Sequence, residues 1–210
     1  MPTGPLQNRV HPDGTILATP HRGTMYGNRG GRIHDPASRQ LLPTKRWATR
    51  QWICCVLQFK QRRRPLMGQG YTELFFMDEV AALAAGHRPC FECRRADAVR
   101  FALAWRNDGS REKAPEMDRV LHLQRLDGQV KRALAAHWDE LPIGAMIRHQ
   151  GNIIAKSPLG ALLWSFEGYR QYGHAALPPN SEKLECLTPR AILDTLSNGY
   201  TPTWHPSANC

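Results

Sequence analysis

The chain has 210 residues, 41% of them hydrophobic, with 28 Lys and Arg against 18 Asp and Glu and a formal net charge of +10. This length supports one domain with a real core or two small ones, and it removes any need for disulfide staples. The sequence contains no apolar run of about 18 residues and no charged-then-apolar leader, so we expect a cytoplasmic protein with neither a membrane span nor a secretory signal.

The positive charge is unevenly distributed. Residues 1–106 hold 17 Lys and Arg against 7 Asp and Glu, whereas residues 107–210 hold 11 of each. Of the 28 basic residues 22 are Arg, the side chain that best fits bidentate contact with phosphate. The first half therefore predicts a nucleic acid partner, DNA in the first place. A solvated basic face with no partner is the alternative.

The stretch from Tyr71 to Trp105 has the clearest local pattern in the chain. Residues 71–77 favour a strand, and the following Ala/Leu run has the start and stop signals of a helix, with Asp78 before it and Gly86 after it. A second helix is predicted after the cysteines, because an apolar stripe recurs at helical spacing through Ala98, Phe101, Ala102 and Trp105.

Cys90 and Cys93 form a Cys-x-x-Cys pair between these two helices. Two thiols at this spacing chelate one tetrahedral ion without strain, and zinc is the natural occupant. The alternative is a buried or redox-active pair of cysteines. The six cysteines are unevenly spaced, which suits a metal site in a reducing compartment better than a disulfide framework.

The segment LFFMDEVAALAAGHRPCFECRR resembles the zinc module of Ada-type DNA repair proteins, the methylphosphotriester repair domain. That signature is an aromatic strand, a helix rich in Ala and Glu, and then Gly-aromatic-Arg-Pro-Cys-x-x-Cys-Arg. The matching residues are Ala84, Gly86, Arg88, Pro89, Cys90, Cys93 and Arg94, with His87 in the aromatic place. The resemblance covers residues 71–95 only, and it implies a structural zinc ion in a fold that faces DNA.

The chain departs from that family upstream of the helix. In place of a Cys-x-x-x-Cys pair it has the adjacent residues Cys54 and Cys55. Adjacent residues on a strand point to opposite faces, so one of the two is expected to supply a third ligand while the other packs or reacts. The candidates for the fourth ligand are His34, His87 and a water molecule. The resemblance therefore does not carry methyl transfer over to this chain.

The predicted fold class is α+β. We expect a basic Gly/Arg-rich arm over residues 1–50, an Ada-like zinc module over 51–106, a helical connector over 107–140 and a small β-rich module over 141–210. Residues 51–60 favour a buried strand that forms a hairpin with the strand beginning at Tyr71. Within the connector, helical patterns begin near Pro115 and again near Val130.

The arm also contains a possible catalytic group. Asn28, His34 and Asp35 are residue types that a nuclease uses to activate water, with Mg²⁺ as a possible second metal. A flexible basic tail is the alternative. We call the Cys-x-x-Cys turn of Cys90 and Cys93 the knuckle. The predicted phosphate-binding residues lie in the arm, in the loop of the expected hairpin and just after the knuckle: Arg29, Arg32, Arg62, Arg63, Arg64, Arg94 and Arg95.

Together these patterns predict a DNA-binding zinc protein that acts on the DNA backbone, as an endonuclease or a DNA-damage-processing factor. One alternative is a non-catalytic nucleic-acid-binding regulator in which zinc only folds the basic half. Another is an Ada-like methyl acceptor that uses Cys54 or Cys55.

Overall fold

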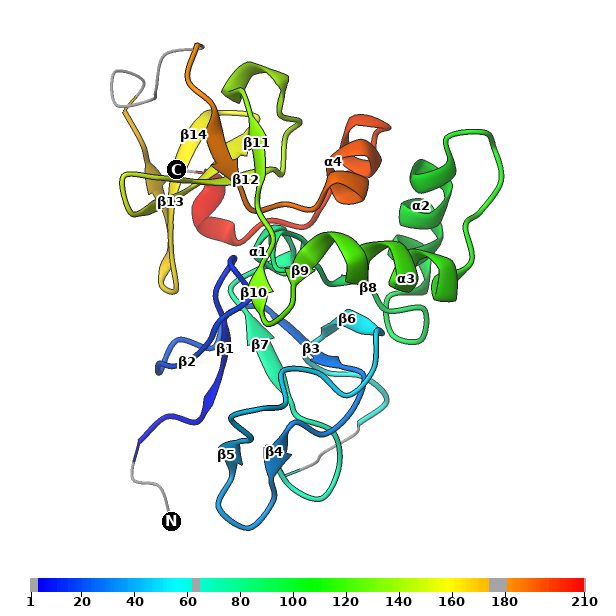
Figure 1. Ribbon diagram of the computed structural model, residues 1–210, viewed down its shortest axis with the longest axis vertical. Coiled ribbons are helices and arrows are strands. Elements are labelled where there is room, and N and C mark those ends of the chain that lie inside the picture. The colour runs from blue at the N-terminus through cyan, green and yellow to red at the C-terminus, as the bar shows by residue number, and fades with distance from the viewer. Residues whose placement is uncertain (1–3, 62–64, 174–180, 210) are drawn as a thin grey trace.

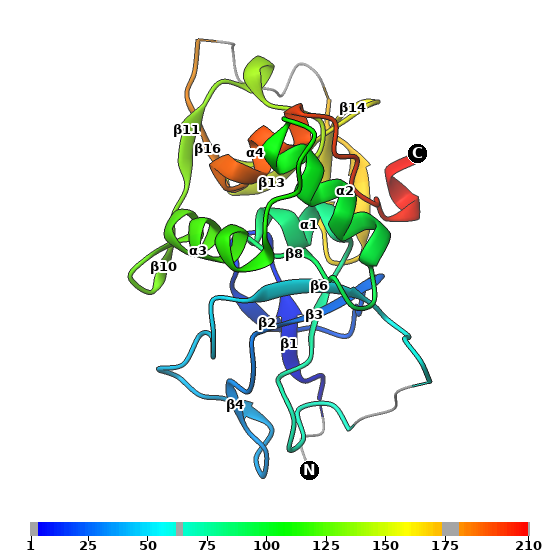
Figure 2. The same cartoon turned by 90° about the vertical axis from the view of Figure 1, so that its right-hand side faces the viewer.

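The computed structural model describes residues 4–61, 65–173 and 181–209. The fold is α+β, as the sequence predicts, with two six-stranded sheets on either side of a short central helix, α1 (Figure 1). Three further helices lie beside α1 on one side of the molecule (Figure 2). Within these residues no helix is both long enough and apolar enough to cross a membrane.

The N-terminal sheet has the strand order β2-β1-β7-β3-β6-β8. Its strands are β1 (Gln7–Val10), β2 (Ile16–Ala18), β3 (Met25–Arg29), β6 (Trp52–Val56), β7 (Leu74–Phe76) and β8 (Arg88–Pro89). Strand β3 pairs antiparallel with both β6 and β7, so it occupies the middle of the sheet. A separate two-stranded hairpin, β4 (His34–Asp35) with β5 (Gln40–Leu41), extends from the same end of the molecule.

The C-terminal sheet has the strand order β11-β16-β12-β13-β14-β15 and is antiparallel throughout. Its strands are β11 (Leu134–Ala136), β12 (Met146–His149), β13 (Asn152–Ser157), β14 (Gly160–Ser165), β15 (Gly168–Gln171) and β16 (Leu184–Cys186). Strands β12 and β13 form a hairpin around Gly151, and β14 follows as the next strand. Residues 141–210 are thus rich in β structure, as expected.

Helix α1 (Glu79–Ala84) begins and ends where the sequence predicts. The Asp78 side chain caps its first turn by accepting a hydrogen bond from the Ala81 amide at 2.9 Å. Gly86 follows the helix with φ +84°, a left-handed conformation that favours glycine. The local start and stop signals therefore mark the bounds of this helix in the sequence.

Every residue of α1 is buried, because the helix contacts three separate parts of the core. Val80 packs with residues of the C-terminal sheet, Ala82 with the N-terminal sheet, and Leu83 with helices α2 and α4. After Glu79 at its first position the helix is entirely apolar, as expected for a short helix with no side facing water. The element thus joins the two sheets into one structure.

The other helices are α2 (Arg95–Arg106), α3 (Ala114–Arg125) and α4 (Arg190–Ser197), with short 3-10 turns η1 (Trp138–Glu140) and η3 (Pro206–Asn209). In α2 the predicted stripe is confirmed, with Ala98, Phe101 and Ala102 buried. Phe101 packs against Leu121 of α3 and Ile192 of α4 in a common cluster.

The predicted hairpin between residues 51–60 and Tyr71 is wrong, because β3 lies between β6 and β7. The expected arm over residues 1–50 supplies β1 and β3 to the same sheet as residues 51–89. Gly27, one of the glycines of the expected Gly/Arg-rich arm, is required by the close packing around β3. A Cβ on Gly27 would lie 2.0 Å from the Ile53 carbonyl oxygen and 2.9 Å from the Phe76 ring.

The second helix expected near Val130 is also wrong. After α3 the chain forms the hairpin β9 (Leu126–Asp127) and β10 (Val130–Lys131), and then β11. The turn residue Gly128 has φ +58°, which suits the tight turn between these strands. The Asp-Gly turn and the pairing of β11 with β16 therefore override the helical pattern.

Candidate metal centre

The two faces of strand β6 have different surroundings, and they separate Cys54 from Cys55. Cys54 belongs to the core cluster with Leu74, Phe76 and Ala82, between the sheet and α1. Cys55 lies opposite Tyr26 of β3 and points to the other face of the sheet. The alternation of side chains along a strand thus places the two neighbouring thiols on opposite sides.

Three thiols lie together on the Cys55 side. The sulfur atoms of Cys55, Cys90 and Cys93 are all within 4.8 Å of one another, and the three cysteines could hold a metal ion. Strand β8 pairs with β6 in parallel, and the Cys90 amide donates to the Cys54 carbonyl at 3.0 Å. This pairing carries the Cys-x-x-Cys turn to the edge of the sheet at which Cys55 lies.

The turn after β8 holds its two sulfurs in place through backbone hydrogen bonds. The Arg94 amide donates to the Cys90 carbonyl at 3.0 Å, and the Glu92 amide donates to the Cys90 sulfur at 3.4 Å. Hydrogen bonds from the Cys55 and Cys93 thiols lower the pKa of Cys90 well below its usual range. The same contact with Cys90 raises the pKa of Cys55. The cluster therefore favours a thiolate at one position even before any ion binds.

The donor set fits zinc. All three cysteines have free thiols rather than disulfides, and thiolate sulfur is a preferred zinc ligand. Three protein ligands leave one tetrahedral position for a water molecule or a substrate, whereas closed structural sites have four. In the described part of the chain, the three cysteines could thus hold an ion through three sulfur ligands.

Neither histidine proposed as a fourth ligand belongs to the thiol group. The His34 ring makes hydrogen bonds with the Thr72 hydroxyl at 2.6 Å and the Gly68 carbonyl at 2.8 Å. His87 is fully buried between the rings of Trp52 and Phe76, and burial lowers its pKa well below the usual value. Of the three candidates named from the sequence, a water molecule is the one compatible with these positions.

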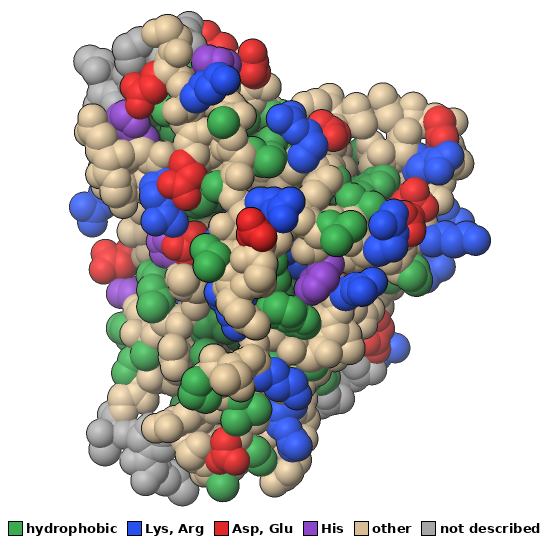
Figure 3. Space-filling view, in the orientation of Figure 1, with side chains coloured by type: hydrophobic (Ala, Val, Ile, Leu, Met, Phe, Trp, Pro, Cys, Tyr) green, Lys and Arg blue, Asp and Glu red, His purple; other side chains and the backbone are tan. Residues whose placement is uncertain are grey.

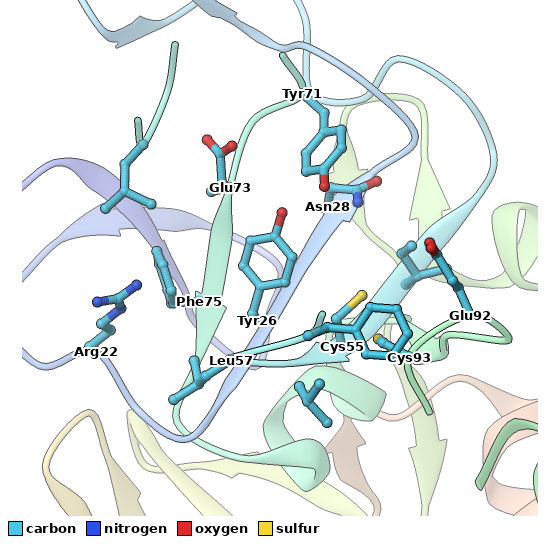
Figure 4. A pocket seen from close by; sticks show the side chains of 14 residues that line it. Arg22, Tyr26, Asn28, Cys55, Leu57, Tyr71, Glu73, Phe75, Glu92 and Cys93 are labelled. Atoms are coloured by element: carbon cyan, nitrogen blue, oxygen red, sulfur yellow. The ribbon is translucent and has the colours of Figure 1, made fainter. Parts of the chain in front are cut away.

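A pocket of about 380 Å³ opens on the metal centre. Its walls come from β3, β6, β7, the knuckle and the loop after β6. The lining residues are Arg22, Tyr26, Asn28, Ile53, Cys55, Val56, Leu57, Phe59, Leu66, Tyr71, Glu73, Phe75, Glu92 and Cys93. In Figure 4 the Tyr26 ring lies between Glu73 and Cys55, and Cys93 lies beside Cys55. Two of the three metal-site sulfurs therefore face a space large enough for a small ligand.

The Cys54 side is closed by a buried ion-pair network. An Arg94 guanidinium nitrogen lies 3.7 Å from the Cys54 sulfur, and another nitrogen of the same group lies 2.7 Å from the Glu79 carboxylate. Glu79 also accepts a hydrogen bond from the Tyr200 hydroxyl at 2.6 Å. Burial raises the pKa of the Cys54 thiol. Cys54, predicted as a metal ligand, thus has a packing role on this face.

The predicted catalytic group does not assemble. His34 is 1% exposed, and both of its ring nitrogens are used in the hydrogen bonds described above. The Asp35 carboxylate accepts hydrogen bonds from the Ala37 and Ser38 amides and so shapes the β4–β5 turn. Asn28 alone of the three lines the pocket. A general base made of His34 and Asp35 is therefore wrong for this pocket.

The predicted phosphate-binding arginines divide into two groups. Arg29 is 0% exposed and its guanidinium stacks on the Trp52 ring at 4.0 Å, and Arg94 is 5% exposed, so both are removed from the surface. Arg32 and Arg95 are exposed and remain available. Residues 62–64, the three arginines of the loop, lie outside the described residues. In Figure 3 basic and acidic side chains are interspersed over the visible face, which shows no continuous basic patch there.

Sequence reasoning missed the aromatic and acidic walls of the pocket. Tyr26 and Asn28 are two residues apart on β3 and so point to the same face, and Glu73, just before β7, is two residues from Phe75 within it. The alternation of side chains with a period of two can be recognised in the sequence before and within β7. In β3 it is hard to recognise, because Gly27 between Tyr26 and Asn28 has no side chain. A strand assignment over Met25–Arg29 would have placed these side chains beside Cys55.

The comparisons with known proteins add no family. No protein-family model, no curated protein and no solved structure matches this chain. The Ada-type resemblance of residues 71–95 therefore stays a prediction from the sequence, and the metal centre rests on the geometry of its three thiols.

Proposed function

We propose that the protein is a zinc protein that processes alkylated nucleic acid, DNA in the first place, and that Cys55 is the acceptor of the alkyl group. Cys55, Cys90 and Cys93 hold the zinc ion in this proposal. The observation that carries it is the opening of a three-thiol centre into a pocket, with Cys55 and Cys93 in the pocket wall. A purely structural ion would not need an open side.

Zinc, when bound, keeps its cysteine ligands in the thiolate form at neutral pH, which is the nucleophilic form. The Cys55 sulfur attacks the alkyl carbon, and a sulfur–carbon bond forms as the bond from that carbon to the nucleic acid breaks. The electron pair of the broken bond leaves with the nucleic acid. Cys55 becomes a thioether, so each chain reacts once and no other reactant is consumed.

Three observations support nucleic acid as the donor. The net charge is +10, and long-range attraction of a polyanion needs charge rather than a shaped patch. Arg32 and Arg95 are exposed near the pocket-bearing sheet and the knuckle respectively. Residues 71–95 resemble a DNA repair module. These supports favour a damage-processing role over the non-catalytic regulator, because a regulator has no use for a pocket at its metal.

Hydrolysis of the DNA backbone is the second candidate function, and one observation favours it. Glu73 and Glu92 line the same pocket as the open metal position, so a carboxylate is available to take a proton from an attacking water. In this case the ion supplies Lewis acidity. An endonuclease of this kind would use the thiol centre instead of His34 and Asp35, with Mg²⁺ as a possible addition.

Deuterated methyl groups on DNA provide the test. Purified zinc-loaded protein is mixed with DNA methylated by a CD₃ donor, and its peptides are weighed by mass spectrometry. We expect one labelled methyl per chain on Cys55 and none on Cys54, while the Cys54→Ser protein should be labelled as wild type is. Absence of label from every methylated DNA would contradict the proposal. Repeated cleavage of unmodified plasmid would favour hydrolysis instead.

A further inference from the structure

Four residues form a row across the N-terminal sheet, on the face that carries the three thiols. Arg9 of β1 lies opposite Phe75 of β7. Tyr26 of β3 lies opposite Phe75 on one side and opposite Cys55 of β6 on the other. Directly opposite residues on neighbouring strands point to the same face of a sheet. The row therefore has a basic end at Arg9 and a thiol end at Cys55, with two aromatic rings between them.

A second arginine joins Arg9 at the basic end, and we call Arg9 and Arg22 the arginine pair. Both guanidinium groups lie over the Phe75 ring, with their central carbons 5.2 Å (Arg9) and 4.3 Å (Arg22) from its centre. In the described part of the chain, neither arginine forms an ion pair with a carboxylate. Burial and the nearby charge of Arg22 lower the pKa of Arg9, because the two like charges repel each other. A bound anion would offset this repulsion.

The two members of the arginine pair differ in exposure. Arg9 is 8% exposed, and its guanidinium donates hydrogen bonds to the His21 carbonyl at 3.0 Å and to the side-chain carbonyl of Asn8. Arg22 is exposed and lines the pocket, so its guanidinium can reach a ligand there. Arg22 is therefore the residue that would contact an anion, and Arg9 supplies a fixed positive charge beside it.

Negative charge lies elsewhere on this face. Glu73, two residues before Phe75, is 4% exposed and accepts a hydrogen bond from the Met67 amide at 2.6 Å. Three thiolates around one divalent zinc leave a further negative charge at the thiol end. In Figure 4 Arg22 and Cys55 lie on opposite sides of Tyr26. The two ends of the row therefore suit different groups, a neutral one at the thiols and an anion at the arginine pair.

We propose that the arginine pair binds an anionic phosphate of the same nucleic acid strand whose alkylated group reacts with Cys55. Neighbouring strands of a sheet are about 4.8 Å apart and Phe75 lies two strands from Cys55, so the two groups are about 10 Å apart. An alkylated strand offers both, a neutral alkylated group and nearby phosphates that keep their charge. The planar guanidinium of Arg22 suits two parallel hydrogen bonds to such a phosphate.

This inference rests on the proposed function for its substrate, but strand binding tests it separately from alkyl transfer. Fluorescence anisotropy measures how zinc-loaded protein binds a short labelled oligothymidylate over a range of salt concentrations. Arg22→Gln should weaken binding about tenfold and lower the slope of log affinity against log salt by about 0.7, the value for one phosphate on a single strand. Arg22→Lys should recover most of the affinity, because it keeps the charge. Arg119→Gln removes an exposed arginine of α3 outside the pocket and should change neither quantity.

The charge of Arg9 is tested by a second pair of variants. Arg9→Gln should weaken strand binding several-fold, and Arg9→Lys should restore it, because a lysine keeps a positive charge beside Arg22. Equal weakening by the two variants would overturn the role assigned to this charge. Displacement of the oligothymidylate by an equal concentration of dTMP would assign the arginine pair to a free nucleotide and overturn the proposal.

Equal affinity and equal salt slope in Arg22→Gln and Arg119→Gln would also overturn the inference. Labelling of Cys55 separates this inference from the proposed function. With CD₃-methylated DNA below saturation, Arg22→Gln should be labelled about tenfold more slowly than wild type. Labelling at the wild-type rate would overturn the inference and leave the proposed function standing. Strand binding that depends on Arg22, with no label on Cys55, would support the inference and contradict the proposed function.

Discussion

The two faces of the N-terminal sheet give neighbouring cysteines opposite surroundings. On one face Cys54 is covered by α1 and by the buried pair of Arg94 with Glu79. On the other face Cys55 joins Cys90 and Cys93 beside an open pocket. The same residue type, one position apart, therefore packs in the core on one face and on the other belongs to a group that could hold a metal ion. The period of two along a strand is the whole cause of the difference.

The charged residues are also arranged differently on the two faces of the sheet. On the Cys54 face the carboxylate of Glu79 is paired with the guanidinium of Arg94, and both side chains are almost fully buried. On the Cys55 face Glu73 and Glu92 line a pocket together with the thiols. The Glu79–Arg94 pair thus lies inside the protein, whereas the carboxylates on the other face lie at a cavity.

The largest expected effect comes from exchanging each cysteine for serine. Cys55→Ser should lower zinc affinity more than about 100-fold, because even changes next to a ligand cost about 10- to 100-fold. Cys54→Ser should keep one zinc per chain and lose only about 1–3 kcal/mol of stability in the core. Competition with a coloured chelator measures the affinity. Equal zinc loss in the two variants would erase the distinction between the two faces.

The next effect concerns the ion pair that covers Cys54. Arg94→Met should lower the free energy of unfolding by about 3–5 kcal/mol, because it leaves the Glu79 carboxylate buried without its partner. Its neighbour Arg95 is exposed, so Arg95→Met should change stability by about 0.5 kcal/mol or less. Urea unfolding of the two variants provides the measurement. A similar small loss in both would mean that the Arg94 pair does not stabilise this face.

A pH effect of about 3 kcal/mol is expected from the helix that covers this face. Burial raises the pKa of Asp78 to about 6, against 3.8 for an ordinary carboxyl, and hydrogen bonds from Ala81, His205 and Tyr169 offset only part of it. The folded state then binds this proton more tightly than the unfolded state. Asp78 therefore favours folding most below pH 4, and this contribution is lost as pH rises through 6.

Asp78→Asn should remove that decline. Unfolding by urea at pH 4, 5, 6 and 7 gives the stability of each protein, and the difference between the wild-type and variant curves isolates this carboxyl. The exposed Asp139→Asn protein serves as the control, with a curve parallel to wild type. A wild-type advantage that grows with rising pH would have the opposite sign to the one expected.

The smallest effect is expected at His34. His34→Ala should cost about 1–3 kcal/mol of stability, because it leaves the Thr72 hydroxyl and the Gly68 carbonyl without this partner. Zinc content and label on Cys55 should not change, since the ring does not belong to the thiol group. Differential calorimetry and peptide mass follow both quantities. If a folded, zinc-loaded His34→Ala protein were not labelled on Cys55, His34 would have a role in the transfer reaction.

The sequence predicts local features of this molecule well and the pairing of distant segments poorly. The helix between Asp78 and Gly86 carries its own start and stop signals, and the opposite directions of Cys54 and Cys55 follow from strand geometry alone. The place of β3 between β6 and β7 depends on contacts between segments about 25 to 50 residues apart, which no local pattern contains. The pocket follows from that pairing, so it too was missed.

The sequence also did not show which arginine side chains are buried. Arg29 and Arg94 were expected on the surface because arginine is mostly exposed. In the structure the guanidinium of Arg29 lies on Trp52, and that of Arg94 pairs with Glu79. The partners that make such burial tolerable come from other elements, so composition counts these arginines as surface charge. The net charge of the chain therefore overstates the positive charge that lies on the surface and is accessible to a polyanion.

X-ray absorption at the zinc edge of the purified protein tests the central claim most directly. The account predicts one zinc per chain with three sulfur neighbours, Cys55, Cys90 and Cys93, at about 2.3 Å and one lighter neighbour at about 2.0–2.2 Å. A well-folded protein that binds no zinc, or a zinc ion surrounded by four sulfurs, would contradict it.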